Sequence, residues 1–170
     1  PILHTYTVRR QIEIDNGFFN AGIQLMQAGI RRKISQLPHA DVSPLPDRVE
    51  GSRQSQVIDS LVAESDLHLT TKRTMDSFQY TELDMLLFRV FNVDTVLLTG
   101  INTDTCVMST TFSAANRGLK PVVVSDCVAS TRGRDSHDMA LELMSRSVAW
   151  VLDVDEITEK LAAHEQGSAA

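Results

Sequence analysis

The sequence predicts an α/β protein built as a three-layer α/β/α sandwich around a mostly parallel sheet. Segments rich in β-branched and aliphatic residues alternate along the chain with segments of helical periodicity. Two of these apolar segments, residues 96–98 and 122–124, show no alternation of polar and apolar residues. Such runs are typical of strands that helices cover on both faces. Strands and helices that alternate in this way form parallel sheets with right-handed crossovers.

Five segments are predicted to be strands because of their residue types. They are residues 2–8, 67–71, 93–99, 121–125 and 150–152. Pro121 fits the start of its strand, since a first residue loses least from lacking an N–H group. Helices are predicted between or after the later strands, at residues 82–91, 104–117, 135–148 and 155–163. The helix at 104–117 follows a Thr-Asp capping signal and ends at Gly118.

The stretch from residue 9 to residue 53 has no sustained periodicity. It contains three prolines and is expected to form a long loop with one short helix. Long loops in compact domains often carry function, so we assign the selection of substrate to this region.

The composition is that of an ordinary globular domain. The 170 residues are 42% hydrophobic and 22% charged, and we interpret them as a single domain over residues 1–170. A net charge of −6 disfavours nucleic acid as a partner. Apolar runs fall far short of the roughly 20 residues that cross a bilayer, so no membrane contact is expected and the cytoplasm is the predicted location. Because the chain opens on a strand without an initiator Met, we expect it to be incomplete at its N-terminus.

Several motifs of well-known enzyme classes are absent from the sequence. There is no G-x-G-x-x-G, no G-x-x-x-x-G-K-[ST], no H-E-x-x-H and no G-x-S-x-G. The five histidines are dispersed along the chain, so no metal site is expected. We therefore predict an activity without a cofactor.

The most informative feature is Cys106. A predicted apolar strand ends at Gly100, a helix is predicted to begin near Asp104, and Cys106 lies in the first turn of that helix. Ligands bind at the carboxyl ends of strands in open α/β sheets. In the first helical turn, N–H groups and the positive end of the helix dipole stabilise a thiolate, and the same groups can hold an oxyanion. The alternative is that Cys106 is a small buried apolar residue. The second cysteine, Cys127, is interpreted as a structural residue at the end of its strand.

Two blocks of the sequence resemble one family. The first is Leu-Thr-Gly-Ile-Asn-Thr-Asp-Thr-Cys-Val at residues 98–107, followed by Thr110 and an Ala-x-x-x-Gly-x-x-x-Val-Val-Val-x-Asp pattern at 114–126. The second comprises residues 50–52 and 72–78. Together they resemble the isochorismatase-like cysteine hydrolases, which include nicotinamidases and carbamoylsarcosine, ureidoacrylate and biuret amidases. The resemblance extends over residues 1–161.

The resemblance implies a catalytic set of Asp, Lys and Cys, in which Lys72 and Cys106 take the last two roles. An ammonium beside a thiolate favours the ionised sulfur. The alternative for Lys72 is a solvated surface lysine. The resemblance also implies that the backbone amides of Asn102 and Cys106 form an oxyanion hole, with a non-proline cis peptide near Ile101–Asn102. Asp104 is interpreted as a helix cap.

The aspartate of that set has no counterpart at the matching place in this chain. In the family it closes a first strand that precedes the strand matched here to residues 2–8, so the first strand and helix are expected to be missing. Asp15 is interpreted as a turn residue, with a role as the general base as the alternative.

Two arginines and two histidines complete the candidates. Arg9 and Arg10 follow the carboxyl end of a predicted strand and are candidate ligands for a substrate carboxylate or carbonyl; solvated loop charges are the alternative. His4 and His137 are interpreted as structural residues.

The function that these observations predict is cysteine-dependent hydrolysis of a small amide or carbamoyl C–N bond through a covalent acyl-enzyme intermediate. The expected partner is a small amide or ureido substrate, and the resemblance implies a homo-oligomer. Isochorismatases proper cleave a vinyl ether without this cysteine, so Cys106 favours an amidase. The alternatives are a catalytically inactive domain that serves as a binding or assembly module, and a redox sensor that uses Cys106 and Cys127.

Overall fold

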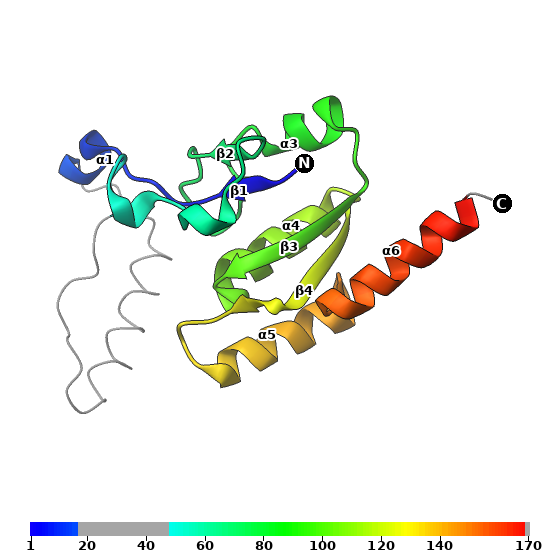
Figure 1. Ribbon diagram of the computed structural model, residues 1–170. Helices are drawn as coiled ribbons and strands as arrows, with labels where there is room; N and C mark the ends of the chain where they lie inside the picture. Colours follow the sequence, from blue (N-terminus) through cyan, green and yellow to red (C-terminus); the bar gives the residue numbers. More distant parts are fainter. Residues whose placement is uncertain (17–47, 169–170) are drawn as a thin grey trace. The chain divides into compact units, whose positions relative to one another are not determined.

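Five strands form two parallel sheets in the computed structural model, which describes residues 1–16 and 48–168 (Figure 1). The described chain divides into two units, Pro1–Leu86 and Leu87–Ala170. Most of the predicted loop at residues 9–53, namely residues 17–47, lies outside the described residues.

The first unit is built on strands β1 (Leu3–Thr5) and β2 (Leu67–Leu69), which pair in parallel with His4 opposite His68. Both strands are shorter than the predicted segments, because a strand lasts only as long as its neighbour offers backbone groups to pair with. Beyond β1, the chain forms helix α1 (Gln11–Asp15) and an isolated parallel bridge between Arg9 and Val49.

The rest of the first unit consists of short helical segments and a small apolar core. The segments are η1 (Arg53–Ser55), η2 (Asp59–Leu61), α3 (Leu83–Met85) and the π-helical turn η3 (Leu86–Val90), within which the unit boundary falls. The buried apolar residues of this unit are Val8, Leu69, Phe78 and Leu83. Val8 and Leu69 lie just after β1 and at the end of β2, so the core supports the carboxyl ends of both strands.

The second unit contains a three-stranded parallel sheet in the order β3 (Thr95–Ile101), β4 (Lys120–Ala129) and β5 (Trp150–Leu152). The register between β3 and β4 shifts, because Leu98 lies opposite Val123 whereas Gly100 lies opposite Val128. β4 therefore bulges beside the end of β3. The strand continues past the predicted end at residue 125, so Cys127 lies inside β4 and the prediction that it ends the strand is wrong.

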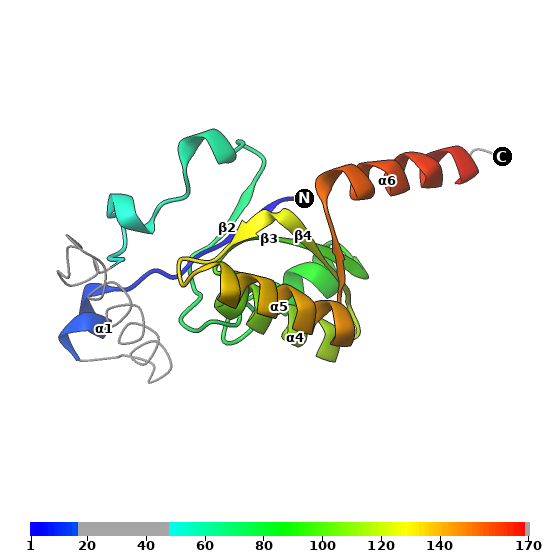
Figure 2. The same ribbon diagram turned by 90° about the horizontal axis from the view of Figure 1, so that it is seen from below.

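Helices lie on both sides of this second sheet, as the sequence predicts for the fold class. The chain leaves β3 through the π-helical turn η4 (Thr103–Val107) and enters α4 (Met108–Asn116); α5 (Arg134–Ser147) follows β4. Helices α4 and α5 lie side by side against one face, and α6 (Val154–Ser168) contacts β4 from the other side (Figure 2). Gly118 ends the α4 segment with a positive φ of 82°.

One apolar cluster joins η4, the sheet and α5. Its buried members are Val107, Val123, Val128, Ala140 and Met144, with Leu98 and Leu141 packed against them. This cluster lies directly beneath the turn that carries Cys106. Within the described residues, no helix has the length and apolar character needed to cross a bilayer.

Candidate active site

Cys106 lies in the first turn of the helix that follows the carboxyl end of β3. This turn is π-helical, since the Val107 N–H donates to the Asn102 carbonyl at 3.1 Å, and the Thr105 N–H donates to the same oxygen at 3.1 Å. Thr103, Thr105 and Val107 are buried, whereas Cys106 is partly exposed. The alternative of a buried apolar cysteine is therefore wrong: its neighbours on both sides are buried and it is not.

The peptide bond between Ile101 and Asn102 is cis, as the resemblance implies. The side chain of Asn102 is also held in place, because its Oδ1 accepts hydrogen bonds from the Thr131 N–H at 3.0 Å and from the Thr131 hydroxyl at 3.1 Å. Asn102 and Cys106, the two residues predicted to supply the oxyanion hole, thus delimit one short turn whose start is fastened to the loop after β4.

Asp104 fastens the same turn to the loop that follows β4. Its carboxylate accepts a hydrogen bond from the Ser130 hydroxyl at 2.7 Å and lies 2.8 Å from Nε of Arg132. The helix cap is Asn102, and Asp104 lies inside the turn. The prediction that Asp104 caps the helix is therefore wrong, because the irregular π-turn begins earlier than the capping signal suggests.

His137 anchors the turn from α5. Its Nδ1 is hydrogen-bonded to the hydroxyl of Thr103 at 2.8 Å, and Thr103 is fully buried. A buried hydroxyl needs such a partner, since an unpaired polar group costs about 1–3 kcal/mol. This contact supports the structural interpretation of His137.

Lys72 lies in the first unit, in the loop after β2. Its side chain is buried, with only 3% of the residue exposed, and its ammonium donates to the Thr74 carbonyl at 2.5 Å and to the Thr7 hydroxyl at 3.3 Å. Charged lysines are almost never fully buried unless paired or hydrogen-bonded. The alternative of a solvated surface lysine is therefore wrong.

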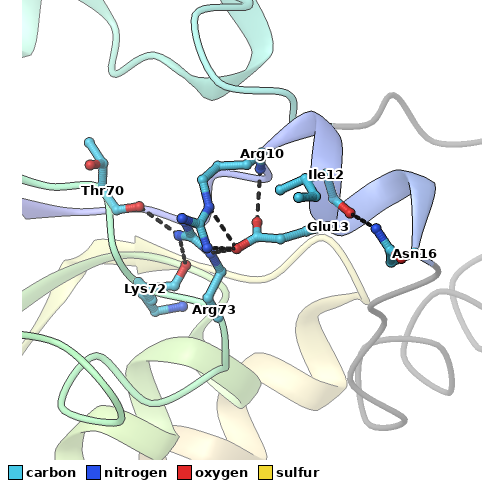
Figure 3. Close-up of polar contacts among 7 residues, drawn as sticks. All are labelled: Arg10, Ile12, Glu13, Asn16, Thr70, Lys72 and Arg73. Carbon is cyan, nitrogen blue, oxygen red and sulfur yellow. Dashed lines mark hydrogen bonds and ion pairs between the residues drawn. The ribbon is translucent and has the colours of Figure 1, made fainter.

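A network of charged side chains reaches the backbone of Lys72 through Arg73 (Figure 3). The carboxylate of Glu13 accepts hydrogen bonds from the Arg10 N–H at 2.8 Å, from the Arg10 guanidinium at 2.7 and 3.0 Å, and from Nε of Arg73 at 3.0 Å. Arg73 in turn donates to the carbonyls of Thr70 at 2.7 Å and Lys72 at 3.2 Å. Burial raises the pKa of Glu13, but the hydrogen bonds from Arg10 and Arg73 outweigh it and lower that pKa to about 2.

The other predicted site residues of the first unit have defined positions. The Arg10 guanidinium is bound to Glu13 and remains largely exposed, and Arg9 takes part in the parallel bridge with Val49. Asp15 ends helix α1 and accepts a hydrogen bond from Gln11 at 2.7 Å, so it is a helical residue rather than part of a turn.

Two histidines that are far apart in the sequence lie side by side in the first unit. The rings of His4 and His68 have centroids 5.1 Å apart, and Nε2 of His4 donates to the Asp66 carboxylate at 2.9 Å. The backbone N–H of Ala63 and His4 hold the pKa of Asp66 below its usual range. In the part of the chain that the structure describes, no three His, Cys, Asp or Glu side chains are placed to hold a metal ion.

A surface cavity of about 320 Å³ also lies in the first unit. It is lined by Tyr6, Gln56, Val57, Asp59, Val62 and His68. Lys72 and Arg73 do not line it, so we do not assign it to the chemistry of Lys72.

Sequence reasoning did not find Glu13, Arg73 or the Ser130–Arg132 loop. The signal for the loop was present, since polar residues that follow β4 must lie at the same sheet edge as the end of the parallel strand β3. The link between Glu13 and Arg73 carried no such signal, because the residues are 60 positions apart and belong to a short helix and a loop.

Comparisons with known proteins show which family and fold this chain resembles. The model of the Isochorismatase domain matches residues 34–156. Maleamate amidohydrolase from Pseudomonas putida is 29% identical over 97 residues, which are 57% of this chain; the match spans 45% of that enzyme, so less than half of the relative's length is covered.

Two solved structures have the same fold. An isochorismatase family protein from Desulfovibrio vulgaris matches with a TM-score of 0.68 and 22% identity, over 94% of this chain and 74% of that one. The nicotinamidase from Bacillus subtilis matches with a TM-score of 0.65 and 21% identity, over 89% of this chain and 74% of that one. The parallel arrangement of strands in both units is therefore that of a known fold.

Proposed function

This chain belongs to the Isochorismatase domain family, and from that premise we propose that it hydrolyses the C–N bond of a small amide or carbamoyl compound. The observation that carries the proposal is Cys106, a partly exposed residue in a helical first turn at the carboxyl end of β3. Hydrogen bonds and an ion pair hold this turn in place. The similarity to a maleamate amidohydrolase supports an amide as the bond that is cleaved.

In the proposed reaction, the sulfur of Cys106 attacks the carbonyl carbon and a C–S bond forms. The C–N bond then breaks, and the amine leaves with the proton that the thiol gave up. Water adds to the thioester, the C–S bond breaks, and a carboxylic acid and the thiol are released. The backbone amides of Asn102 and Cys106 are proposed to stabilise the oxyanion of each addition step.

Lys72 is proposed to favour the ionised form of the Cys106 sulfur. Its burial and its two hydrogen bonds support this role, because a lysine held in a defined place is a fixed positive charge rather than a mobile surface one. Arg9 and Arg10 remain proposed ligands of a substrate carboxylate or carbonyl.

The direct test is ammonia release by the full-length protein from maleamate, nicotinamide and an N-carbamoyl amino acid. We expect release from at least one probe, loss of that release in Cys106→Ser, and an unchanged rate in Cys127→Ser. We also expect an unchanged rate in EDTA, since the proposed steps use no metal. Static light scattering on the same sample measures the predicted homo-oligomer.

A second measurement separates the alternative functions. Iodoacetamide at pH 7 followed by peptide mass spectrometry reports the two cysteines separately, because trypsin cleavage after Arg117 places them on different peptides. Fast alkylation of Cys106 that substrate slows supports the hydrolase. An unreactive Cys106 with no ammonia release indicates a binding or assembly module, and a reversible disulfide between the two cysteines indicates a redox sensor.

A further inference from the structure

Glu13 is linked to the loop that carries Lys72 by one continuous set of hydrogen bonds (Figure 3). Oε1 of Glu13 accepts from Nε of Arg73, and Nη1 of Arg73 reaches back to the carbonyls of residues 70 and 72. The side chains of Glu13 and Arg73 are only 13% and 17% exposed, so this ion pair is largely shielded from solvent. A shielded, charge-assisted hydrogen bond keeps its two side chains in a fixed arrangement more firmly than a fully exposed ion pair does.

We propose that Glu13 is a positioning residue for Lys72, acting through Arg73, in the amide hydrolysis proposed above, on which this inference rests. Glu13 fixes the Arg73 guanidinium, Arg73 fixes the backbone on both sides of residue 71, and that backbone fixes the direction in which the Lys72 side chain leaves the loop. Glu13 itself takes no part in the chemistry.

The hydrogen bonds of Lys72 explain why its direction depends on this loop. Its ammonium donates to the carbonyl of Thr74, which belongs to the same loop that Arg73 holds at residues 70 and 72. The hydroxyl of Thr74 donates to the carbonyl of Asp76, which extends the set of contacts further along the chain. A change at one end of this loop therefore displaces the acceptor on which the ammonium rests.

The charges explain why the carboxylate is needed. Glu13 lies between the guanidinium groups of Arg10 and Arg73, and it contacts both. Without its negative charge, the two guanidinium groups repel each other, and Arg73 gives up its contacts with the loop for solvent. A guanidinium can hold two carbonyls at once because its donors are fixed in one plane, which a lysine in the same place does not offer.

The test uses a double-mutant cycle in the full-length protein, with the rate of Cys106 alkylation by iodoacetamide at pH 7 as the readout. Lys72→Met is expected to lower that rate about tenfold, because the proposed role of the Lys72 ammonium is to favour the ionised sulfur of Cys106. Glu13→Gln is expected to lower it at least about threefold, and to have no further effect when Lys72→Met is already present. Arg73→Met is expected to behave like Glu13→Gln.

The matched control is Asp59→Asn, which also removes one carboxylate from an arginine pair of the same unit, but a fully exposed one. It is expected to leave the alkylation rate unchanged. Circular dichroism and the thermal midpoint of each variant show whether it folds. If Glu13→Gln does not fold, Arg73→Met replaces it in the double-mutant cycle with Lys72→Met.

The outcomes separate this inference from the proposed function. If Lys72→Met leaves the alkylation rate unchanged, the proposed role of Lys72 is wrong. If Lys72→Met slows alkylation but folded Glu13→Gln does not, or if the effect of Glu13→Gln persists unchanged in the Lys72→Met background, the positioning role of Glu13 is overturned while the proposed function stands.

Discussion

Cys106 stays accessible because the residues beside it anchor its turn. Thr103 is fastened to α5 through His137, and Asp104 is fastened to the loop after β4 through Ser130 and Arg132. The alternate residues Thr103, Thr105 and Val107 are buried, whereas Cys106 among them is partly exposed. The proposed oxyanion stabilisation requires backbone amides in a fixed geometry, which an anchored turn provides.

Removing the charge of Asp104 should weaken this anchoring. In Asp104→Asn, we expect the free energy of unfolding to fall by about 1–3 kcal/mol, because the largely buried Arg132 side chain loses its charged partner. Urea denaturation followed by circular dichroism measures the change. Asp94→Asn, which removes a carboxylate from a pair exposed on both sides, is the control and should leave the urea midpoint unchanged. Equal effects of the two substitutions would contradict the anchoring role.

Glu13 should make stability depend on pH in acid. Its pKa in the folded protein is about 2, below the ordinary value of 4.5, so the ionised carboxylate stabilises the fold above pH 4.5. This contribution is lost as the pH falls from 4.5 toward 2. The difference in unfolding free energy between the unmodified protein and Glu13→Gln should therefore be constant above pH 5 and should shrink steadily below pH 4.5. A difference that does not change with pH would show that the charge of Glu13 contributes nothing.

Helix α5 supports the Cys106 turn through the apolar cluster of the second unit. Met144 is fully buried and packs with Val107 of η4 and with Val123 and Val128 of β4. These two valines lie five positions apart, on either side of the bulge in β4, yet both belong to the same cluster. The packing of α5 therefore supports the turn that carries Cys106.

Truncating Met144 should be costly. Met144→Ala is expected to lower the free energy of unfolding by about 2–5 kcal/mol, because it leaves a cavity in a closely packed cluster. Met139→Ala on the same helix, where 61% of the residue is exposed, should change it by less than about 0.5 kcal/mol. Urea denaturation of both variants makes the comparison, and similar midpoints would show that α5 does not pack as described.

The proposed chemistry draws on both units of the molecule. Lys72 belongs to the first unit and Cys106 to the second. Each is held within its own unit by hydrogen bonds to neighbouring side chains or backbone, Lys72 by Thr7 and Thr74 and the Cys106 turn by the loop after β4. The proposed activity therefore requires one residue from each unit.

The effects of Cys106→Ser and Lys72→Met on the rate of ammonia release should therefore not be additive. Cys106→Ser and Lys72→Met are each expected to lower kcat for ammonia release by about 10³-fold or more, and the double variant should be no worse than Cys106→Ser alone. Steady-state kinetics with the best of the amide probes gives these values. Independent, multiplying losses would show that the two residues do not act in one step.

Several features were predictable from local pattern. The centres of all five strands, the helix after the Cys106 turn and helix α5 lie where residue type and periodicity place them. The cis peptide at Ile101–Asn102 followed from the resemblance of residues 98–107 to one family. Strand ends were less predictable. β1 and β2 end where the backbone hydrogen bonds between them end, and β4 continues through a bulge.

The amino-acid order thus established the α/β class, the nucleophile candidate and the position of Cys106 at a strand-to-helix turn, because these depend on contacts between near neighbours in the chain. Only the tertiary structure shows three further features. They are the burial of Lys72, the ion pair between Glu13 and Arg73, and the contacts of Ser130 and Arg132 with Asp104. These contacts form between groups that are mostly far apart in the sequence, so local sequence patterns do not predict them. Only folding brings such groups within hydrogen-bonding distance.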